Sequence, residues 1–430
     1  MKTAAYPSYL RKCGWHGLLP ARAHQPSLQT DTRCDVAIVG AGYTGIAAAK
    51  RWAELSPGSD IVLVDASVPE EGNPGRNSGF LLEVALAHDA NPGEMQRMKQ
   101  CNGLLSETMQ QIVADVAASG IDCGLRRTGT YRAAAGAEGI RALEQYRQFL
   151  DAAGLPATAL DRDQLEDRLG TRFYRQGLYS PHCYLAQPAA LVRAMLNQLR
   201  STVRRFEHTP ATSLQRTDSH WELATPGGRI TSRHVVLANN AFAKGLGIGG
   251  SRIVAMYTYA ALTAPLAPAA LDKLGSEQEW GLLPAHRLGS TLRRTADGRL
   301  LVRSLYGYER ESGDSDVESA LQSSLHRRFP LLGDLEFESL WSGATGFTMN
   351  GAPVWGEHRP GLFVSAGCNG GGVVKGTLFG RLLADLAHGK DVPDVHALFG
   401  RARWMPPEPF RSLGFKLMSR LERRRAAAEV

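Results

Sequence analysis

The chain has 430 residues, of which 43% are hydrophobic and 21% are charged, so an intrinsically disordered or collagen-like protein is excluded and about three domains are expected. Six scattered cysteines without a CxxC pair support neither a zinc site nor a disulfide framework, and no metal site is predicted. The net charge of +7 is concentrated in residues 401–430, which carry eight Arg or Lys against three Glu, so a nucleic-acid partner is not expected.

The predicted elements begin after an N-terminal leader, residues 1–34, which has no apolar stretch of signal-peptide length. A strand over 35–39, a helix over 46–55 and a strand over 61–64 predict two parallel strands with a right-handed crossover. Further helices are expected over 92–117, 137–153, 162–169, 189–199 and 373–387. Further strands are expected over 125–134, 203–206, 211–216, 221–225, 234–238, 252–262, 290–295, 299–306 and 362–365. No apolar run is long enough to span a membrane, so a cytoplasmic protein is expected.

A GxGxxG pattern follows the first strand directly and is typical of a dinucleotide site. Its first glycine permits a tight turn, its second lets the backbone approach a pyrophosphate, and its third lets the helix pack on the strand. Asp65, at the end of the second strand, is expected to accept hydrogen bonds from ribose hydroxyls and to repel the 2′-phosphate of NADP. The alternative is a glycine turn in an ordinary α/β protein. The residues predicted to bind the dinucleotide here are Gly40, Gly42, Tyr43, Thr44, Gly45 and Asp65.

Two further segments favour FAD over NAD. Residues 73–79 form a polar, glycine-rich loop, and residues 367–372 form a second glycine cradle just before a predicted helix. FAD is long enough to require support at both ends, and a helix N-terminus near the isoalloxazine would stabilise the negative charge of the reduced flavin. The residues expected to contact FAD in these segments and after the strand over 234–238 are Arg76, Asn77, Ser78, Gly79, Ala238, Gly367, Asn369, Gly370, Gly371, Gly372 and Val373.

With these segments in order, the sequence resembles the D-amino-acid-oxidase superfamily of flavoproteins, and within it the γ-glutamylputrescine oxidase branch. The matching segments are Ser8-Tyr9, DVAIVGAGYTG, GRNSGF, VVLANNAF, WSGATGFTMNGAPVWG and GLFVSAGCNGGG. The resemblance implies an α/β fold with a Rossmann-like FAD-binding domain assembled from residues 35–100, 180–250 and 340–395. It also implies an inserted substrate domain, residues 101–179 and 251–339, built on a mostly antiparallel sheet. A basic tail, residues 396–430, is expected to be helical.

The resemblance also implies that a hydride passes to flavin N5 from a carbon that bears an amine, and that the resulting imine hydrolyses. Amino-acid oxidases of this superfamily resemble one another in placing, after a Trp-x-Gly element, an Arg that binds the substrate carboxylate. The stretch after Trp341 contains no Arg. We therefore expect an amine whose carboxylate or phosphonate, if present, lies away from the reacting carbon. The residues predicted to contact the substrate are Tyr259, Arg303, Tyr306, Lys375 and Trp341.

Most of these assignments have a structural alternative. Tyr259 is predicted to stack beside the amine, and the alternative is a core tyrosine. Arg303 and Lys375 are predicted to bind a distant anion, and the alternative is that both face solvent. For His88, which follows the flavin loop, a structural role is favoured over catalysis. The loops that carry covalent flavin links in some relatives hold neither His nor Cys here, so the FAD is predicted to be non-covalent.

The C-terminal tail combines an apolar stripe with positive charge. Phe410, Leu413, Leu417 and Leu421 recur at helical spacing among Arg and Lys residues. Contact of residues 410–425 with the inner face of an anionic membrane is one interpretation. The favoured alternative is a helix that packs its stripe on its own protein. Because both glycine cradles precede residue 390, deletion of 410–430 is expected to leave the flavin site intact.

These observations predict a soluble, FAD-dependent enzyme that oxidises a small amine and is reoxidised by O₂. The first alternative is a membrane-associated flavin dehydrogenase that acts on a hydroxy acid or amino acid and passes electrons to a quinone. The basic tail slightly favours that alternative. A module that only senses a nucleotide is the least favoured interpretation.

Overall fold

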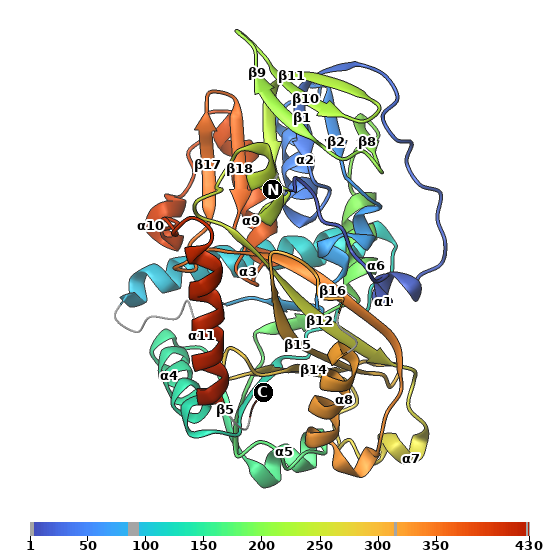
Figure 1. The fold of residues 1–430 in the computed structure, drawn as a ribbon, viewed down its shortest axis with the longest axis vertical. Helices are drawn as coiled ribbons and strands as arrows, with labels where there is room; N and C mark the ends of the chain where they lie inside the picture. Colours follow the sequence, from blue (N-terminus) through green and yellow to red (C-terminus); the bar gives the residue numbers. More distant parts are fainter. Residues whose placement is uncertain (1–3, 85–93, 314–315, 427–428, 430) are drawn as a thin grey trace.

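Two eight-stranded sheets follow one another along the long axis of the molecule (Figure 1). The structure is a computed structural model that describes residues 4–84, 94–313, 316–426 and 429. The first sheet has the strand order β17-β18-β11-β1-β2-β8, and β10 and β9 continue from β11. Its strands are β1 (Thr32–Val39), β2 (Ile61–Val64), β8 (Val203–Phe206), β9 (Ser213–Arg216), β10 (Trp221–Thr225), β11 (Gly228–Leu237), β17 (Val354–Arg359) and β18 (Leu362–Ala366).

The second sheet has the order β16-β12-β15-β14-β13-β4-β6-β5, and all its pairs are antiparallel except β4 with β13. Its strands are β4 (Thr130–Ala134), β5 (Thr158–Asp161), β6 (Gln176–Ser180), β12 (Val254–Thr263), β13 (Trp280–Pro284), β14 (Thr291–Arg294), β15 (Leu300–Tyr308) and β16 (Phe337–Phe347). This mixed architecture confirms the predicted α/β fold class. Strand β16 crosses the domain boundary predicted at residue 340, because it stays paired with β12 as far as Phe347.

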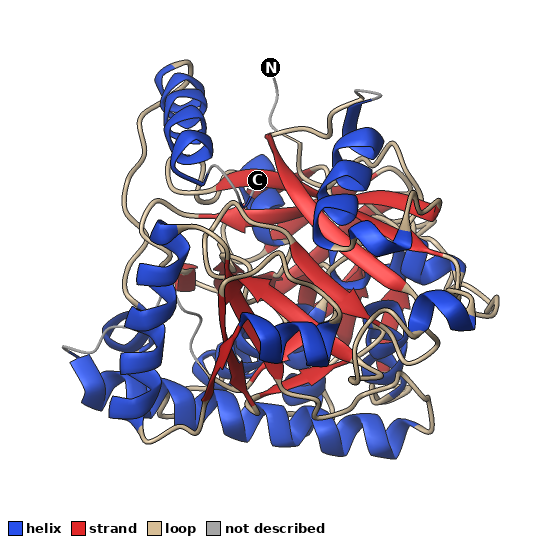
Figure 2. Cartoon of the chain, turned by 90° about the horizontal axis from the view of Figure 1, so that it is seen from below, coloured by secondary structure: helices blue, strands red, loops and turns tan. Residues whose placement is uncertain are grey.

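Helices lie around the central strands (Figure 2). The longer ones are α2 (Tyr43–Leu55), α3 (Met95–Ser119), α4 (Ala137–Ala153), α5 (Arg162–Leu169), α6 (Pro188–Asn197), α8 (Asp316–Arg328), α9 (Val374–Ala387) and α11 (Phe410–Ala426). The short elements include α1 (Gly14–Gly17), α7 (Pro268–Leu271), α10 (Val395–Phe399), η1 (Pro69–Glu71), η2 (Asn73–Gly75), η4 (Asn240–Leu246), η5 (Pro330–Leu332) and the pair β3 (Phe80–Leu82) and β7 (Cys183–Leu185). Within the described ranges, no helix has the length and apolarity that a membrane crossing requires.

Close packing of α2 on α9 brings the two glycine-rich segments together. Each helix begins directly after one of them. The contact requires glycine on α9, because a Cβ atom at Gly380 would lie 2.0 Å from the backbone oxygen of Thr44. Parallel pairing of β18 with β11, and of β11 with β1, places the carboxyl ends of these strands at the same edge of the sheet.

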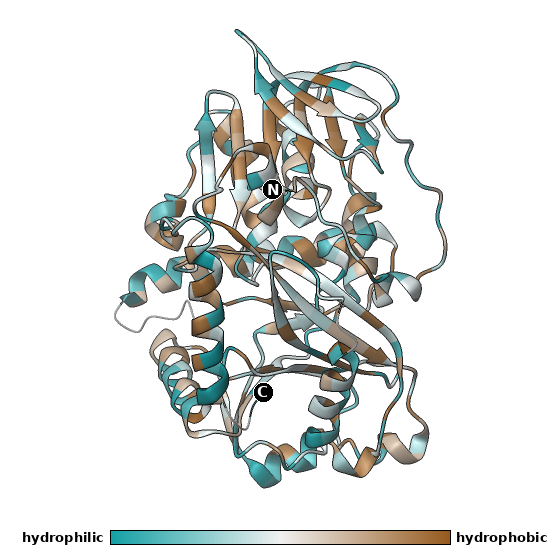
Figure 3. Ribbon diagram, viewed as in Figure 1, coloured by the Kyte–Doolittle hydropathy of each residue, from teal (hydrophilic) through white to brown (hydrophobic). Residues whose placement is uncertain are grey.

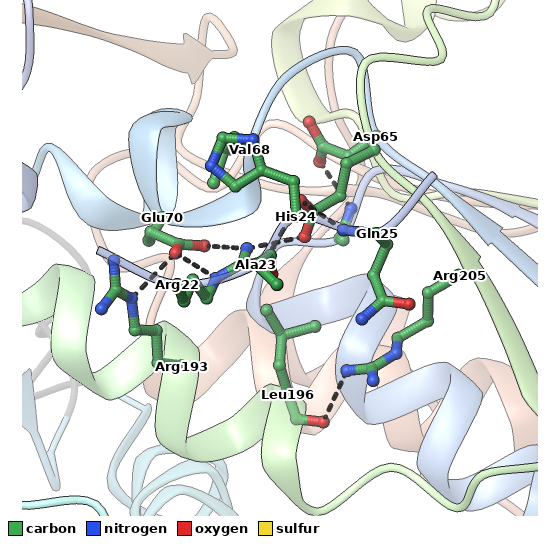
Figure 4. Close-up of polar contacts among 12 residues, drawn as sticks. Arg22, Ala23, His24, Gln25, Asp65, Val68, Glu70, Arg193, Leu196 and Arg205 are labelled. Atoms are coloured by element: carbon green, nitrogen blue, oxygen red, sulfur yellow. Dashed lines mark hydrogen bonds and ion pairs between the residues drawn. The ribbon is translucent and has the colours of Figure 1, made fainter. Parts of the chain in front are cut away.

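The N-terminal segment is attached to the first sheet by a buried ionic network (Figure 4). Arg22 donates from Nε and Nη2 to the two carboxylate oxygens of Glu70, at 2.6 and 2.7 Å. Arg22 also pairs with Glu207, and Arg193 pairs with Glu70 at 2.8 Å. Burial raises the pKa of the fully buried Glu70 carboxyl, but the hydrogen bonds and charges of the two arginines outweigh burial and hold that pKa below its usual value.

Substitution of this carboxylate should make stability depend on pH in a defined direction. A carboxyl whose pKa is lower in the folded chain adds stability above its unfolded pKa, near 4.3, and loses it as the pH falls through the folded pKa. Glu70→Gln should therefore lower the free energy of unfolding by about 1–3 kcal/mol at neutral pH. The difference from the unsubstituted protein, followed by urea unfolding, should shrink as the pH is lowered below about 4. A difference that is independent of pH would contradict this account of the network.

Candidate functional site

A cavity of about 1550 Å³ is lined by residues from both sheets, from both glycine cradles and from the C-terminal helix α11. This volume exceeds the roughly 300–1000 Å³ that is common for small-molecule pockets. The cavity therefore has room for a dinucleotide together with a second ligand. The lining residues at its two cradles include most of the predicted cofactor-binding residues: Gly40, Gly42, Tyr43, Thr44, Asp65, Arg76, Asn77, Ser78, Ala238, Gly367, Asn369, Gly370, Gly371, Gly372 and Val373.

The first cradle is a tight glycine turn between β1 and α2. Gly40 has φ of +99°, in the left-handed region that favours glycine. Gly42 is the N-cap of α2, so the N–H groups of the first helical turn point toward the cavity end of the helix. Gly45 does not line the cavity, and its role is packing, because a Cβ atom there would lie 1.9 Å from the carbonyl oxygen of Gly40.

Asp65 holds this turn in place through its carboxylate. One oxygen accepts a hydrogen bond from the Ala41 N–H at 2.8 Å, and the other accepts one from the Ser67 N–H at 3.0 Å. Burial raises the pKa of the Asp65 carboxyl, and these two hydrogen bonds act against that effect. A carboxylate so placed at the cavity edge keeps lone pairs available for a ligand hydroxyl.

The loop at 73–79 is held by hydrogen bonds to backbone carbonyl groups. The Arg76 guanidinium donates to the carbonyl oxygens of Glu71 at 2.6 Å, Arg11 at 3.0 Å and Ser342 at 2.9 Å. Its carbon atom also lies 3.7 Å from the centre of the Tyr9 ring. These contacts join the loop to the N-terminal segment and to β16, so Arg76 acts as a cross-link in addition to lining the cavity.

Trp341 supports the same loop from behind, and the prediction that it contacts the substrate is wrong for this structure. Its side chain is fully buried and does not line the cavity. Its indole N–H donates to the carbonyl oxygen of Arg76 at 3.0 Å. Its ring meets the ring of Trp15 edge-on, with centroids 6.0 Å apart, and the indole N–H of Trp15 donates to the carbonyl oxygen of Asn77 at 2.9 Å. Gly79, the last residue of the loop, does not line the cavity and packs against Arg293 and Ala186.

The second cradle combines left-handed backbone with an asparagine that closes the turn. Gly367, Asn369 and Gly370 have φ values of +73°, +51° and +86°. The Asn369 side chain accepts from the N–H of Thr348 at 2.9 Å and donates to the carbonyl oxygen of Gly351 at 2.8 Å. Helix α9 then begins without a side-chain cap, so the N-terminal end of α9 offers its first N–H groups to a ligand.

Strand β12 presents the opposite face to the cavity from the one predicted. Thr258 and Ala260 line the cavity, as do Val254 and Met256. Side chains alternate along a strand, so Tyr259 points into the hydrophobic core on the other side of the sheet, where it is 2% exposed. Its hydroxyl accepts a hydrogen bond from the N–H of Ser312. The core alternative therefore holds for Tyr259, and its predicted contact with a substrate amine is wrong.

Three of the predicted substrate residues do line the cavity: Arg303, Tyr306 and Lys375. Arg303 donates to the Tyr306 hydroxyl at 3.3 Å, and that hydroxyl donates to the carbonyl oxygen of Arg287 at 2.8 Å. Lys375 lies in the first turn of α9 and is buried. The solvent-facing alternative is therefore excluded for Lys375. His88 lies outside the described residues.

Sequence reasoning missed Arg132, which lines the cavity from β4. Its guanidinium donates to the carbonyl oxygen of Pro284 at 3.2 Å and lies 4.8 Å from the centre of the Tyr146 ring. Burial lowers the pKa of Arg132. The strand pattern at 130–134 was visible in the sequence, but nothing local distinguished this arginine from a solvated one.

The tail also belongs to the cavity wall, which overturns the expectation that residues 410–430 are dispensable for the site. The lining residues of α11 are Phe410, Arg411, Gly414, Phe415, Met418, Ser419, Glu422 and Arg423. Glu422 is buried and pairs with Arg287 at 2.5 Å. Deletion of this segment would open the cavity to solvent.

Replacement of Asp65 tests the first cradle. Asp65→Asn keeps the side-chain shape but removes the charge, whereas Asp65→Ala removes both acceptors. Loss of a charge-assisted acceptor costs about 1.5–3 kcal/mol, so both variants should retain the dinucleotide less well, and the alanine variant should be the weaker binder. The measurement is the fraction of bound cofactor after gel filtration and dilution. Retention equal to that of the unsubstituted protein would remove Asp65 from the site.

Comparison with known proteins places these features in a family. The family model described as FAD dependent oxidoreductase (DAO) matches residues 35–386. The chain is 26% identical over 381 residues to γ-glutamylputrescine oxidoreductase of Escherichia coli (strain K12), which covers 84% of this chain and 85% of that protein. It is also 26% identical over 387 residues to glycine oxidase of Geobacillus kaustophilus, and the match covers 86% of this chain and 97% of that protein. The crystal structure of that glycine oxidase superposes with a TM-score of 0.73 and 22% identity, over 87% of this chain and all of that one.

Proposed function

Because the chain belongs to the DAO family of FAD-dependent oxidoreductases, we propose that it oxidises the C–N bond of an amine that carries an anionic group away from the reacting carbon. The family match confirms the predicted resemblance, the FAD cofactor and the assignment as an oxidoreductase of amines or amino acids. The observation that carries the narrower proposal is a pair of cavity-lining arginines, Arg132 and Arg303, without a carboxylate partner among the residues the structure describes.

Arg132 and Arg303 lie on one face of the second sheet. Arg132 pairs with Leu283 across β4 and β13, and Thr291 pairs with Arg303 across β14 and β15. All four of these residues line the cavity, as does Ala260, which pairs with Arg303 across β12 and β15. Neighbouring strands are about 4.8 Å apart, so the Cα atoms of the two arginines are separated by about 14 Å. An elongated ligand could therefore meet both guanidinium groups.

The bonding of these arginines leaves donors available. A guanidinium has five N–H donors, and each of the two uses one in a hydrogen bond to a neutral oxygen. A cation that burial has partly desolvated is unfavourable without an opposite charge, so a carboxylate or phosphonate would stabilise both side chains. Arg287, by contrast, is already neutralised by Glu422. Lys375 is proposed to meet the same class of anion at the start of α9.

The residues after Trp341 support an anion that is remote from the reacting carbon. Ser342, Gly343, Ala344 and Thr345 include no guanidinium that could hold a carboxylate beside the cradle. The two relatives at 26% identity are named for compounds that differ in this respect. Glycine has its carboxylate on the carbon that bears the amine, whereas γ-glutamylputrescine has its carboxylate far from its terminal amine. The arrangement of Arg132 and Arg303 favours the second type of substrate.

In the proposed reaction the chain binds and orients the amine and excludes water. FAD, when bound, supplies the hydride acceptor at its N5 atom. Thr258 and Ala260 would pack against the substrate carbon chain, and Arg303, positioned by Tyr306, would bind the anionic end. The glycine cradle and the N-terminus of α9 would stabilise negative charge on the reduced cofactor.

A substrate panel tests this proposal. Under anaerobic conditions, primary amines with a distal carboxylate or phosphonate should bleach the flavin faster than D-alanine or glycine. Arg303→Ala, Arg132→Ala and Lys375→Ala should each raise KM for the acidic amines about tenfold or more, and should spare uncharged amines, because one charge-assisted pair is lost. Arg310→Ala, an exposed arginine outside the cavity lining, is the matched control. Fastest turnover of D-alanine would refute the distal-anion assignment.

The cofactor link is also testable. The residues at 342–345 and 76–79 include no His or Cys, so acid precipitation should leave FAD in the supernatant and a colourless pellet. Colour that stays with the pellet would establish a covalent bond instead.

The electron acceptor has two candidates. O₂ is the first, because the amine and amino-acid oxidases of this family are reoxidised by it. A membrane quinone is the second candidate, and the exposed apolar residues of α11 favour it. Oxygen consumption with release of hydrogen peroxide supports the oxidase, whereas slow reoxidation in air with fast reduction of a soluble quinone supports the dehydrogenase.

A further inference from the structure

Helix α11 packs on the protein with a face other than its apolar stripe. Its inward residues include Phe415, whose ring stacks on Tyr308 with centroids 5.1 Å apart, and Glu422, which pairs with Arg287 at 2.5 Å. Ala426 is also buried. These three positions of the helix lie within about 40° of one another at 100° per residue. They define the inner face of α11.

The apolar stripe lies on the opposite side and faces solvent. Phe410, Leu413, Leu417 and Leu421 are 66%, 58%, 60% and 39% exposed, and Phe410, at the start of the helix, also lines the cavity. We call these four residues the outer ridge. Figure 3 shows that the first turns of α11 are largely hydrophobic and that its far end is hydrophilic. A helix that only packs on its own protein turns its apolar stripe inward, so the outer ridge contradicts that alternative.

The charge around the outer ridge has one sign. Arg420 flanks it on one side and Arg425 on the other, Arg424 continues its direction in the last turn, and all three are exposed. Lys416 adds a further exposed cation. The single acidic residue of the helix, Glu422, lies on the inner face and is already paired. The outer side of α11 therefore presents apolar side chains between cations.

We propose that the outer ridge of α11 docks on an anionic lipid bilayer. Apolar side chains between Arg and Lys are the composition of helices that lie in the plane of a membrane interface, where the ridge enters the acyl boundary and the cations meet lipid phosphates. The proposal does not depend on which amine is oxidised. Since the inner face of the same helix lines the cavity, docking sets the cavity about one helix diameter, roughly 10 Å, from the bilayer surface.

Vesicle co-sedimentation of the flavin-loaded, full-length protein tests the docking. The protein should bind phosphatidylcholine vesicles that contain phosphatidylglycerol, and should bind pure phosphatidylcholine vesicles weakly. Added salt should weaken binding, because exposed charges are screened. Leu417→Glu should abolish binding, and Arg420→Glu should reduce it by fivefold or more, since one cation near an anionic surface contributes about fivefold.

Matched controls separate the ridge from general changes in the protein. Leu331→Glu alters an equally exposed leucine, 70% exposed, on η5, and Lys390→Glu reverses an exposed charge beyond α9. Both controls should bind vesicles as the unsubstituted protein does. Leu417 and Arg420 do not line the cavity, so all four variants should keep the flavin spectrum and the amine turnover in solution.

Two results would overturn the proposal. The first is failure of the unsubstituted protein to bind anionic vesicles at low salt, or equal loss of binding in the control variants. The second is a dimer in sedimentation that Leu417→Glu dissociates while vesicle binding is absent, which would assign the ridge to contact between two copies of the chain. Loss of amine turnover with vesicle binding preserved would count against the proposed function and leave the docking surface standing.

Discussion

The contact between α2 and α9 is the constraint on which the site depends. It brings together two glycine segments that are more than 320 residues apart in the sequence, and it exists only because Gly380 lets α9 touch the backbone of Thr44. A methyl group there would separate the helices and, with them, the two N-termini that face the cavity. The site for a long dinucleotide thus depends on helix packing at Gly380, which does not itself line the cavity.

The loop between the cradles is fixed by contacts to backbone atoms, which explains why its supporting residues are easily mistaken for catalytic ones. Arg76 donates to three carbonyl groups, and the indoles of Trp341 and Trp15 donate to carbonyl groups of the loop itself. Trp341 belongs to a segment by which the sequence resembles its family, yet its side chain holds the loop in position from outside the cavity. A tryptophan in a motif therefore carries less information about the chemistry than a cavity-facing arginine on a sheet.

The sequence correctly predicted the features that depend on residues close together in the chain. The parallel unit, the glycine cradles and the helices over 137–153 and 162–169 agree with the structure, because period, capping and turn residues are short-range signals. The two faces of β12 were also evident, but which face meets the cavity depends on a second sheet, so Tyr259 was assigned to the wrong side. Arg22, Trp15 and Arg132 were not assigned for the same reason, since their roles arise from partners far away in the chain.

The tail gives the clearest case of a pattern whose meaning depends on orientation. Its apolar stripe was visible in the sequence, yet a stripe that faces inward is ordinary packing and one that faces outward is a surface for a partner. The inner side of the helix carries Glu422, which pairs with Arg287, and the carbonyl group of Arg287 in turn accepts a hydrogen bond from the hydroxyl of Tyr306, which positions Arg303. A continuous set of contacts therefore joins the outer helix to the arginine proposed to bind the substrate.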